Sequence, residues 1–140
     1  MEINEKEFLA SFQLAIDKSI VEQEVLVRRL ILGVFTRCIK KSPVDTGRFR
    51  SAWTVSLDKR SDESTTHLND SPKGSIDNKT LSDGVLVVSS FDLKNNKVTY
   101  IQNNMPYAHR LEYGYSTQAT AGVARISAKE ELNEFNRASS

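Results

Sequence analysis

The sequence predicts an α+β fold with a long N-terminal helix, an antiparallel sheet with a hairpin, and a C-terminal helix packed on the sheet. Three patterns indicate this fold class. Apolar residues recur every three to five positions across residues 5–40. Residues 53–57, 84–93 and 97–104 are rich in β-branched and aromatic side chains, and helical spacing returns across residues 121–137.

The N-terminal pattern fits either one long helix or two helices joined near Ser19 or Gly33. Pro43 ends it, because the residue before a proline avoids the helical region. One unbroken helix would reach roughly 50 Å at 1.5 Å per residue. A domain of this size is only about 30–35 Å across. We therefore expect that the helix breaks, or that another chain covers part of its apolar face.

The middle of the chain is expected to supply the sheet. Residues 53–57 alternate between apolar and polar side chains and predict a short strand. Residues 84–93 and 97–104 predict a hairpin, because the polar Lys94-Asn95-Asn96 segment between them is typical of a tight turn. Residues 58–83 are too polar to build a core, and they predict a long, mobile loop.

Two helices are expected to close the chain. Pro106 suits the first position of a short helix that runs to Tyr113 and is stopped by Gly114. The C-terminal helix across residues 121–137 has one apolar stripe and a charged outer face. We expect these elements to form one domain, residues 1–140, with its long polar loop on the surface.

Composition excludes some classes of protein. The chain has 19 basic and 18 acidic residues, so its net charge of +1 gives no global attraction to nucleic acid or to an acidic membrane. We expect no signal peptide and no membrane span. Cys38 lies in a helical stripe and predicts a buried, inert thiol rather than a nucleophile paired with His67 or His109. One cysteine and two histidines at wide spacing predict no metal site, and we expect no cofactor.

The stretch SPVDTGRFRSAW, residues 42–53, contains the Asp-Thr-Gly triplet of aspartic proteases. Those enzymes need an apolar setting in which two aspartates share one proton. Arg48 and Arg50 would instead keep the carboxylate of Asp45 ionised, so we expect a structural turn and no enzyme. In that interpretation Asp45 caps a short helix or pairs with Arg48, and Trp53 anchors the start of the sheet.

The same region raises two other functional hypotheses. A basic strip with interleaved aromatic residues is typical of nucleic-acid binding, although three nearby acids offset it. This strip spans Arg48–Arg60, and it defines the alternative of a small nucleic-acid-binding or regulatory module. A regulatory or toxin–antitoxin dimer built on the long helix is a further alternative.

Two stretches of the chain together resemble segments of the small neck and tail-completion proteins of tailed bacteriophages. SPVDTGRFRSAW is similar to their segment TPVDTGRLR-x-S/N-W. PYAHRLEYGYSTQATAGVARISAKE, which begins at Pro106, is similar to their segment PYA-x-x-LEYGYSKQAPAGMVRVTV. The chain departs from the family at Ser42 and Thr120, where the family usually has threonine and proline.

The resemblance implies a non-catalytic structural protein of the virion, in a ring commonly of six subunits at the head–tail junction. Such a ring completes the tail or joins it to the head. The implied partners are further copies and other neck, connector or tail-tube proteins, with passive contact to DNA in the lumen. The implied location is the virion, and the bacterial host cytoplasm during assembly.

The motif positions, together with charged residues that we expect at subunit contacts, define the candidate site. They are Asp45, Gly47, Arg48, Arg50, Trp53, Tyr107, Arg110, Leu111, Glu112, Tyr113, Gly114, Gln118 and Arg125.

Overall fold

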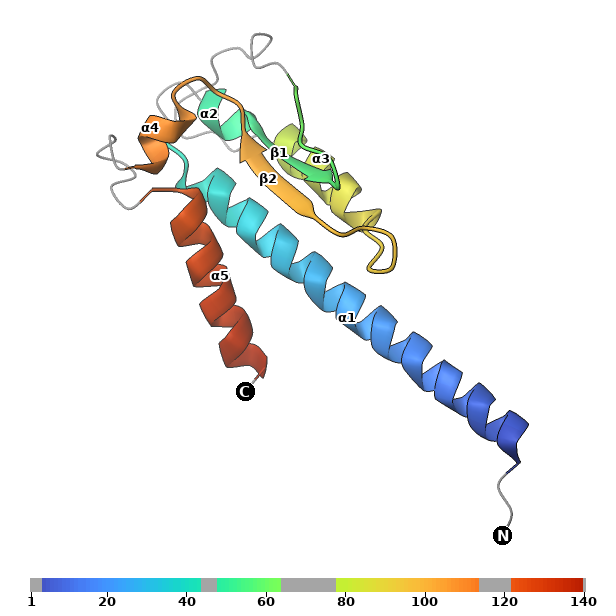
Figure 1. Ribbon diagram of the computed structural model, residues 1–140. Helices are drawn as coiled ribbons and strands as arrows, with labels where there is room; N and C mark the ends of the chain where they lie inside the picture. The colour runs from blue at the N-terminus through green and yellow to red at the C-terminus, as the bar shows by residue number, and fades with distance from the viewer. Residues whose placement is uncertain (1–3, 44–47, 64–77, 114–121, 140) are drawn as a thin grey trace.

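The structure is a computed structural model that describes residues 4–43, 48–63, 78–113 and 122–139. Its elements are α1 (Glu5–Lys41), α2 (Arg48–Ser51), β1 (Trp53–Leu57), α3 (Asn78–Ser89), β2 (Thr99–Asn103), α4 (Ala108–Glu112) and α5 (Ala124–Ser139) (Figure 1). The predicted α+β class is confirmed, with a long N-terminal helix, an antiparallel sheet and a C-terminal helix.

Helix α1 is a single unbroken helix of 37 residues, so it is roughly 55 Å long. Asn4 caps its start by accepting a hydrogen bond from the backbone N–H of Lys6 at 2.9 Å. The chain does not break at Ser19 or at Gly33, the two joints that the sequence allowed. Figure 1 shows the N-terminal half of α1 projecting away from the other elements. The helix therefore overhangs its own domain.

The hydrophobic core gathers around the C-terminal quarter of α1. In this helix the buried residues begin only at Ile31. The core combines these α1 residues with others from α2, β1 and α3 and from residues that flank β1, α3, β2 and α5: Ile31, Phe35, Cys38, Ile39, Phe49, Ala52, Trp53, Val55, Val88, Phe91, Met105 and Val123. Burial of these side chains is what holds the separate elements together.

The predicted hairpin over residues 84–93 and 97–104 is wrong, because most of its first half belongs to helix α3. Thr80, Gly84 and Val88 follow one another at intervals of four and are all buried, so they form one helical face. Gly84 lets α3 approach α1 closely, since a Cβ there would lie 2.2 Å from the ring of Phe35. Packing of this face on α1 and β1 outweighs the β propensity of the valines.

The sheet consists of β1 and β2, which pair antiparallel with Trp53 opposite Asn103 and Leu57 opposite Thr99. Strand β2 thus pairs with the first predicted strand instead of with residues 84–93. The connection between the strands contains α3, so the predicted loop over residues 58–83 ends earlier, at Asn78. Its central part, residues 64–77, lies outside the described residues.

Helix α5 packs chiefly along α1 rather than on the sheet, where the sequence predicted it. Arg37 of α1 forms ion pairs with Glu130 at 3.0 Å, with Glu131 at 2.8 Å, and with Glu134. The hydrogen bond that Arg37 donates to Glu131, together with the charges of the three acids, raises the pKa of Arg37 despite its partial desolvation. Gly33 makes room for this contact, because a Cβ would lie 2.1 Å from the Glu131 carboxylate. The charged cluster thus joins α5 to α1 around Arg37.

Candidate functional site

The first of the two motifs closes the C-terminal end of α1 and starts the sheet. The hydroxyl of Ser42 donates to the carbonyl of Cys38 at 2.6 Å and accepts from the indole N–H of Trp53 at 2.7 Å. All three residues are buried. Trp53 therefore anchors β1 directly to the last turn of α1, which confirms its predicted anchoring role. A buried indole N–H needs such a partner.

Arg50 also acts on the end of α1. Its guanidinium donates to the carbonyl of Lys40 at 3.0 Å and to that of Ser42 at 3.3 Å. Carbonyl groups in the last turn of a helix have no partner within the helix, and a cation there also suits the helix dipole. In this structure Arg50 thus makes contacts inside its own chain, at a position where we expected a subunit contact.

The two motifs meet through aromatic rings. Phe49 packs edge-on against Trp53 with ring centroids 5.7 Å apart, and it lies 5.9 Å from the ring of Tyr107. The side chain of Asn103 donates to the carbonyl of Phe49 at 2.8 Å, which ties the same turn to β2. Because Phe49 and Trp53 are buried, neither ring of the basic strip is free to stack on a nucleic-acid base.

Glu112 joins α4 to the start of α5. Its carboxylate accepts from the backbone N–H groups of Val123 at 2.9 Å, Ala124 at 2.7 Å and Arg125 at 2.9 Å. Partial burial acts to raise the pKa of Glu112, but these three N–H groups and the Arg125 side chain outweigh it and lower the pKa. Glu112 is therefore a helix cap supplied from a different element, which its sequence position alone did not predict.

Gly122 permits this cap. Its φ is +86°, and a Cβ at this position would lie 2.4 Å from the backbone oxygen of Glu112. Arg125 completes the arrangement, since its guanidinium pairs with the Glu112 carboxylate at 3.0 Å and lies 4.6 Å from the ring of Tyr113. Glu112, which we expected at a subunit contact, thus pairs with Arg125 of its own chain.

The other candidate residues divide into described and undescribed positions. Leu111 is half-buried and packs against the core, whereas Arg48 and Arg110 are exposed. Asp45, Gly47, Gly114 and Gln118 lie outside the described residues, so the predicted cap by Asp45 lies there too. The second motif is therefore described only in part.

Burial raises the pKa of the Cys38 thiol to about 12, so the predicted buried thiol is confirmed. His109 lies on α4 with its ring 4.5 Å from that of Tyr113. Within the described ranges, no three His, Cys, Asp or Glu side chains gather as metal ligands. No helix in the same ranges is long and apolar enough to cross a membrane.

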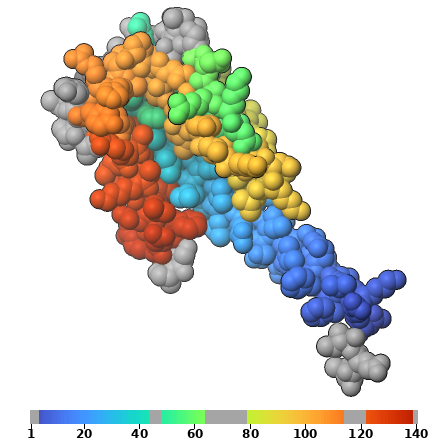
Figure 2. All heavy atoms as spheres, in the orientation of Figure 1, coloured from blue at the N-terminus to red at the C-terminus, as the bar shows by residue number. Residues whose placement is uncertain are grey.

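The most unusual surface of the molecule is the α1 overhang, which we define as residues 4–19. Every residue in this segment is exposed. Phe8 and Phe12 are 55% and 57% exposed, and their rings stack with centroids 6.3 Å apart. Ile16 follows at the same spacing of four, so these three side chains form one apolar stripe. Figure 2 shows the segment standing clear of the rest of the molecule.

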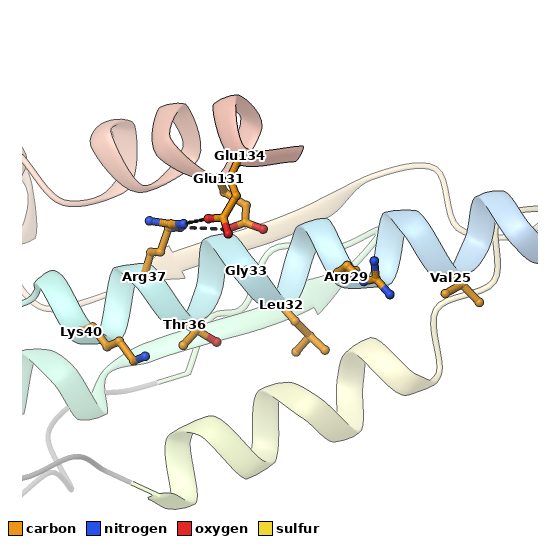
Figure 3. A pocket seen from close by; sticks show the side chains of 9 residues that line it. All are labelled: Val25, Arg29, Leu32, Gly33, Thr36, Arg37, Lys40, Glu131 and Glu134. Carbon is orange, nitrogen blue, oxygen red and sulfur yellow. Dashed lines mark hydrogen bonds and ion pairs between the residues drawn. The ribbon is translucent and has the colours of Figure 1, made fainter. Parts of the chain in front are cut away.

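A second feature, a groove, lies along the part of α1 nearer the core. The α1 groove, as we call it, runs along α1 from Val25 to Lys40 and is bordered by Glu131 and Glu134 of α5, with a volume of about 710 Å³. In Figure 3 Arg37 is directed toward the two glutamates, and Leu32 extends from the other side of α1. Sequence reasoning did not find this groove, because its cations fit the solvated face of any helix.

Comparison with known proteins adds no assignment: no protein-family model matches the chain, and no curated protein or solved structure matches it either.

Proposed function

We propose that this chain is a non-catalytic structural protein of a tailed-phage virion, which assembles into a ring at the head–tail junction. The resemblance to neck and tail-completion proteins rests on the two motifs. They follow the N-terminal helix in the same order as in that family. In the structure the first motif holds the end of α1 through Trp53 and Arg50, and the second motif caps the start of α5 through Glu112. They act as structural clamps, which suits a building block more than an enzyme.

The observation that carries the proposal is the α1 overhang. The exposed stripe includes two stacked phenylalanines, and burial of this apolar surface against a partner would lower the free energy. A helix of roughly 55 Å on a body this small presents that stripe far from its own core. Repeated contact of this kind between copies closes into a ring when the rotation between neighbours divides a full turn.

The nucleic-acid alternative receives less support from the geometry. Its strip places Phe49 and Trp53 in the core and engages Arg50 with backbone carbonyl groups. Arg60 lies 5.6 Å from the ring of Tyr100, so it is held near β2. If the strip did bind DNA, affinity would fall steeply with salt, and a DNA titration at low and moderate salt measures this directly.

Native mass spectrometry of the full chain across a range of concentrations tests the proposal. We expect one closed stoichiometry above a dimer, commonly six subunits in the family that the motifs resemble. A dimer at every concentration contradicts the ring. If the chain stays monomeric alone, isolated phage tails are added as a template, and failure to bind them also contradicts the proposal.

A further inference from the structure

We propose that the C-terminal part of α5 is a releasable arm, which covers the continuation of the apolar stripe along α1 and leaves α1 when its ion pairs are screened. The α5 arm, as we call it, comprises residues 128–138. Its release lengthens the apolar surface that α1 offers to a second copy. The inference deepens the proposed function, and its covering role rests on the proposed copy-to-copy contact.

The start of α5 is anchored in the core, but the arm is not. Val123 and Ser127 are both buried. Beyond Ser127, none of the residues of the α5 arm is buried, and the most enclosed are the half-buried Glu130, Glu131 and Phe135. Figure 1 shows α1 and α5 close together at the start of α5 and apart at its end. The arm therefore lacks the apolar burial that holds the start of the same helix.

Charged side chains join the arm to α1. Arg37 pairs with Glu130, Glu131 and Glu134, and Lys41 pairs with Glu130 at 3.0 Å. None of these five side chains is fully enclosed, since their exposed fractions run from 15% for Glu131 to 63% for Glu134. Ion pairs that remain in contact with water weaken as salt is added, because dissolved ions screen the charges. The arm is thus held by a class of contact that salt removes.

The arm lies on the same side of α1 as the apolar stripe. Eighteen residues make five full turns of a helix, so positions eighteen apart share one side. The stripe residues Phe8, Phe12 and Ile16 therefore recur further along α1 as three aliphatic residues at the same angles: Leu26, Leu30 and Val34. Gly33 and Arg37, which contact the arm, lie on this side too.

Exposure along this side of α1 falls where the arm lies beside it. Phe12 is 57% exposed and Leu26 is 42% exposed, whereas Leu30 is half-buried. The Glu131 carboxylate fills the space next to Gly33. One apolar side of α1 is therefore bare toward the N-terminus and covered by the arm toward the C-terminus. A second copy that packs on the bare part gains further apolar contact when the arm leaves.

Hydrogen exchange of the full chain at pH 7, in low salt and in about 1 M sodium chloride, tests the release. A segment as short as the arm does not stay helical when it is detached, so its backbone amides then exchange quickly. We expect the arm amides to exchange roughly tenfold faster in the higher salt, while those of residues 122–127 change less than about twofold. Exchange of the arm that does not respond to salt overturns the proposal.

Matched substitutions at low salt separate the ion pairs from other effects of salt. Arg37→Gln removes the central cation, and we expect it to speed exchange of the arm roughly tenfold without added salt. Arg29→Gln is the control, because Arg29 is exposed in the same groove but no ion pair joins it to the described part of α5. Glu131→Gln changes the other partner and should act in the same direction as Arg37→Gln. Equal exchange in the Arg37→Gln and Arg29→Gln variants contradicts the release.

The thiol of Cys38 shows whether the start of α5 stays in place. Cys38 and Val123 belong to the same hydrophobic core. We expect Cys38 to stay unreactive toward a thiol reagent under the conditions that free the arm. Labelling of Cys38 that rises together with exchange of the arm means that all of α5 leaves, and this result also overturns the proposal.

Sedimentation tests the covering role. Glu131→Gln loosens the arm without changing α1, so we expect self-association to be roughly tenfold tighter than in Glu63→Gln, which changes an exposed acid outside α5. Adding Phe12→Asp should cancel this gain. Adding Leu14→Asp should not, because Leu14 is 69% exposed and lies about 200° round the helix from Phe12. No gain, or a gain that Phe12→Asp leaves unchanged, removes the covering role.

The two proposals fail in different ways. A dimer whose exchange and association both respond to Glu131→Gln keeps the arm and removes the ring. A closed ring in which Arg37→Gln and Glu131→Gln change neither exchange nor association keeps the proposed function and removes the arm.

Discussion

The cap that Glu112 supplies to α5 gives the sharpest prediction for the isolated chain. Its carboxylate accepts three backbone N–H groups at 2.7–2.9 Å and pairs with Arg125 at 3.0 Å. Loss of a helix cap costs about 0.5–2 kcal/mol. The ion pair adds at most about 1 kcal/mol, since the Arg125 side chain is 60% exposed. We therefore expect Glu112→Ala to lower the free energy of unfolding by about 2 kcal/mol.

Urea unfolding followed by far-UV circular dichroism, at one fixed protein concentration, measures this loss. With a slope of about 2 kcal/mol per molar urea, the midpoint should fall by about 1 M. Glu112→Gln loses the charge but keeps one accepting oxygen, so it should cost about half as much. Glu63→Gln, at an exposed acid far from α5, should change the free energy by less than about 0.5 kcal/mol. If Glu112→Ala shifts the midpoint no more than Glu63→Gln does, the cap is not formed.

The pH dependence follows from the direction of the pKa shift. The pKa of Glu112 is lower in the folded chain than in the unfolded chain, so its contribution is fully present above the unfolded pKa, about 4.3. That contribution is lost as the pH falls through the folded pKa. The difference in unfolding free energy between the wild-type chain and Glu112→Gln should therefore be constant from pH 5 to pH 8 and shrink below about pH 4. A difference that grows on acidification would contradict this sign.

Three further variants or reagents test other parts of the fold. Phe35→Ala removes a fully buried ring that packs on Gly84. We expect the free energy of unfolding to fall by about 3–5 kcal/mol, seen as a broad or absent urea transition. A urea midpoint within about 0.5 M of wild type would contradict the central place of Phe35 in the core. Gly122→Ala places a Cβ at a φ of +86° and 2.4 Å from the Glu112 backbone oxygen, so we expect a loss of about 1–3 kcal/mol by the same assay, and none if α5 begins differently. Cys38, whose pKa is raised to about 12, should react with a thiol reagent at pH 8 about a thousandfold slower in the native chain than in urea; rapid native labelling would place it outside the core.

Long, strongly periodic segments of the sequence predicted their structure well. Helix α1, strand β1, the short helix α4 and helix α5 all lie where spacing and capping residues place them. Pro43 and the cations Lys40 and Lys41 marked the end of α1 within two residues. These features depend on local chain geometry, so the sequence alone carries them.

The errors and omissions all depend on tertiary contacts. Residues 84–89 read as a strand because valine favours extended structure, yet Gly84 and Val88 pack as one face of a helix on Phe35. The cap by Glu112 joins residues eleven to thirteen positions apart in the sequence, so no spacing rule reveals it. The intervals of four between Thr80, Gly84 and Val88 were the one sequence signal that could have predicted α3.

The overhang illustrates a different kind of inference. The sequence predicted that an unbroken helix would outreach its domain and need cover from another chain, and the structure shows the helix unbroken with Phe8 and Phe12 exposed. Three of the candidate motif residues, in contrast, contact their own chain. Trp53, Arg50 and Glu112 make contacts inside the chain, whereas the exposed apolar stripe on which we base the proposed contact lies on α1.

Electron microscopy of the full chain at assembling concentration tests the central claim, that copies of this protein meet repeatedly and close. The account predicts closed rings of one diameter, or tubes of stacked rings, and predicts that Phe12→Asp abolishes them while Leu14→Asp does not. A field of compact twofold dimers that both substitutions leave unchanged would contradict it.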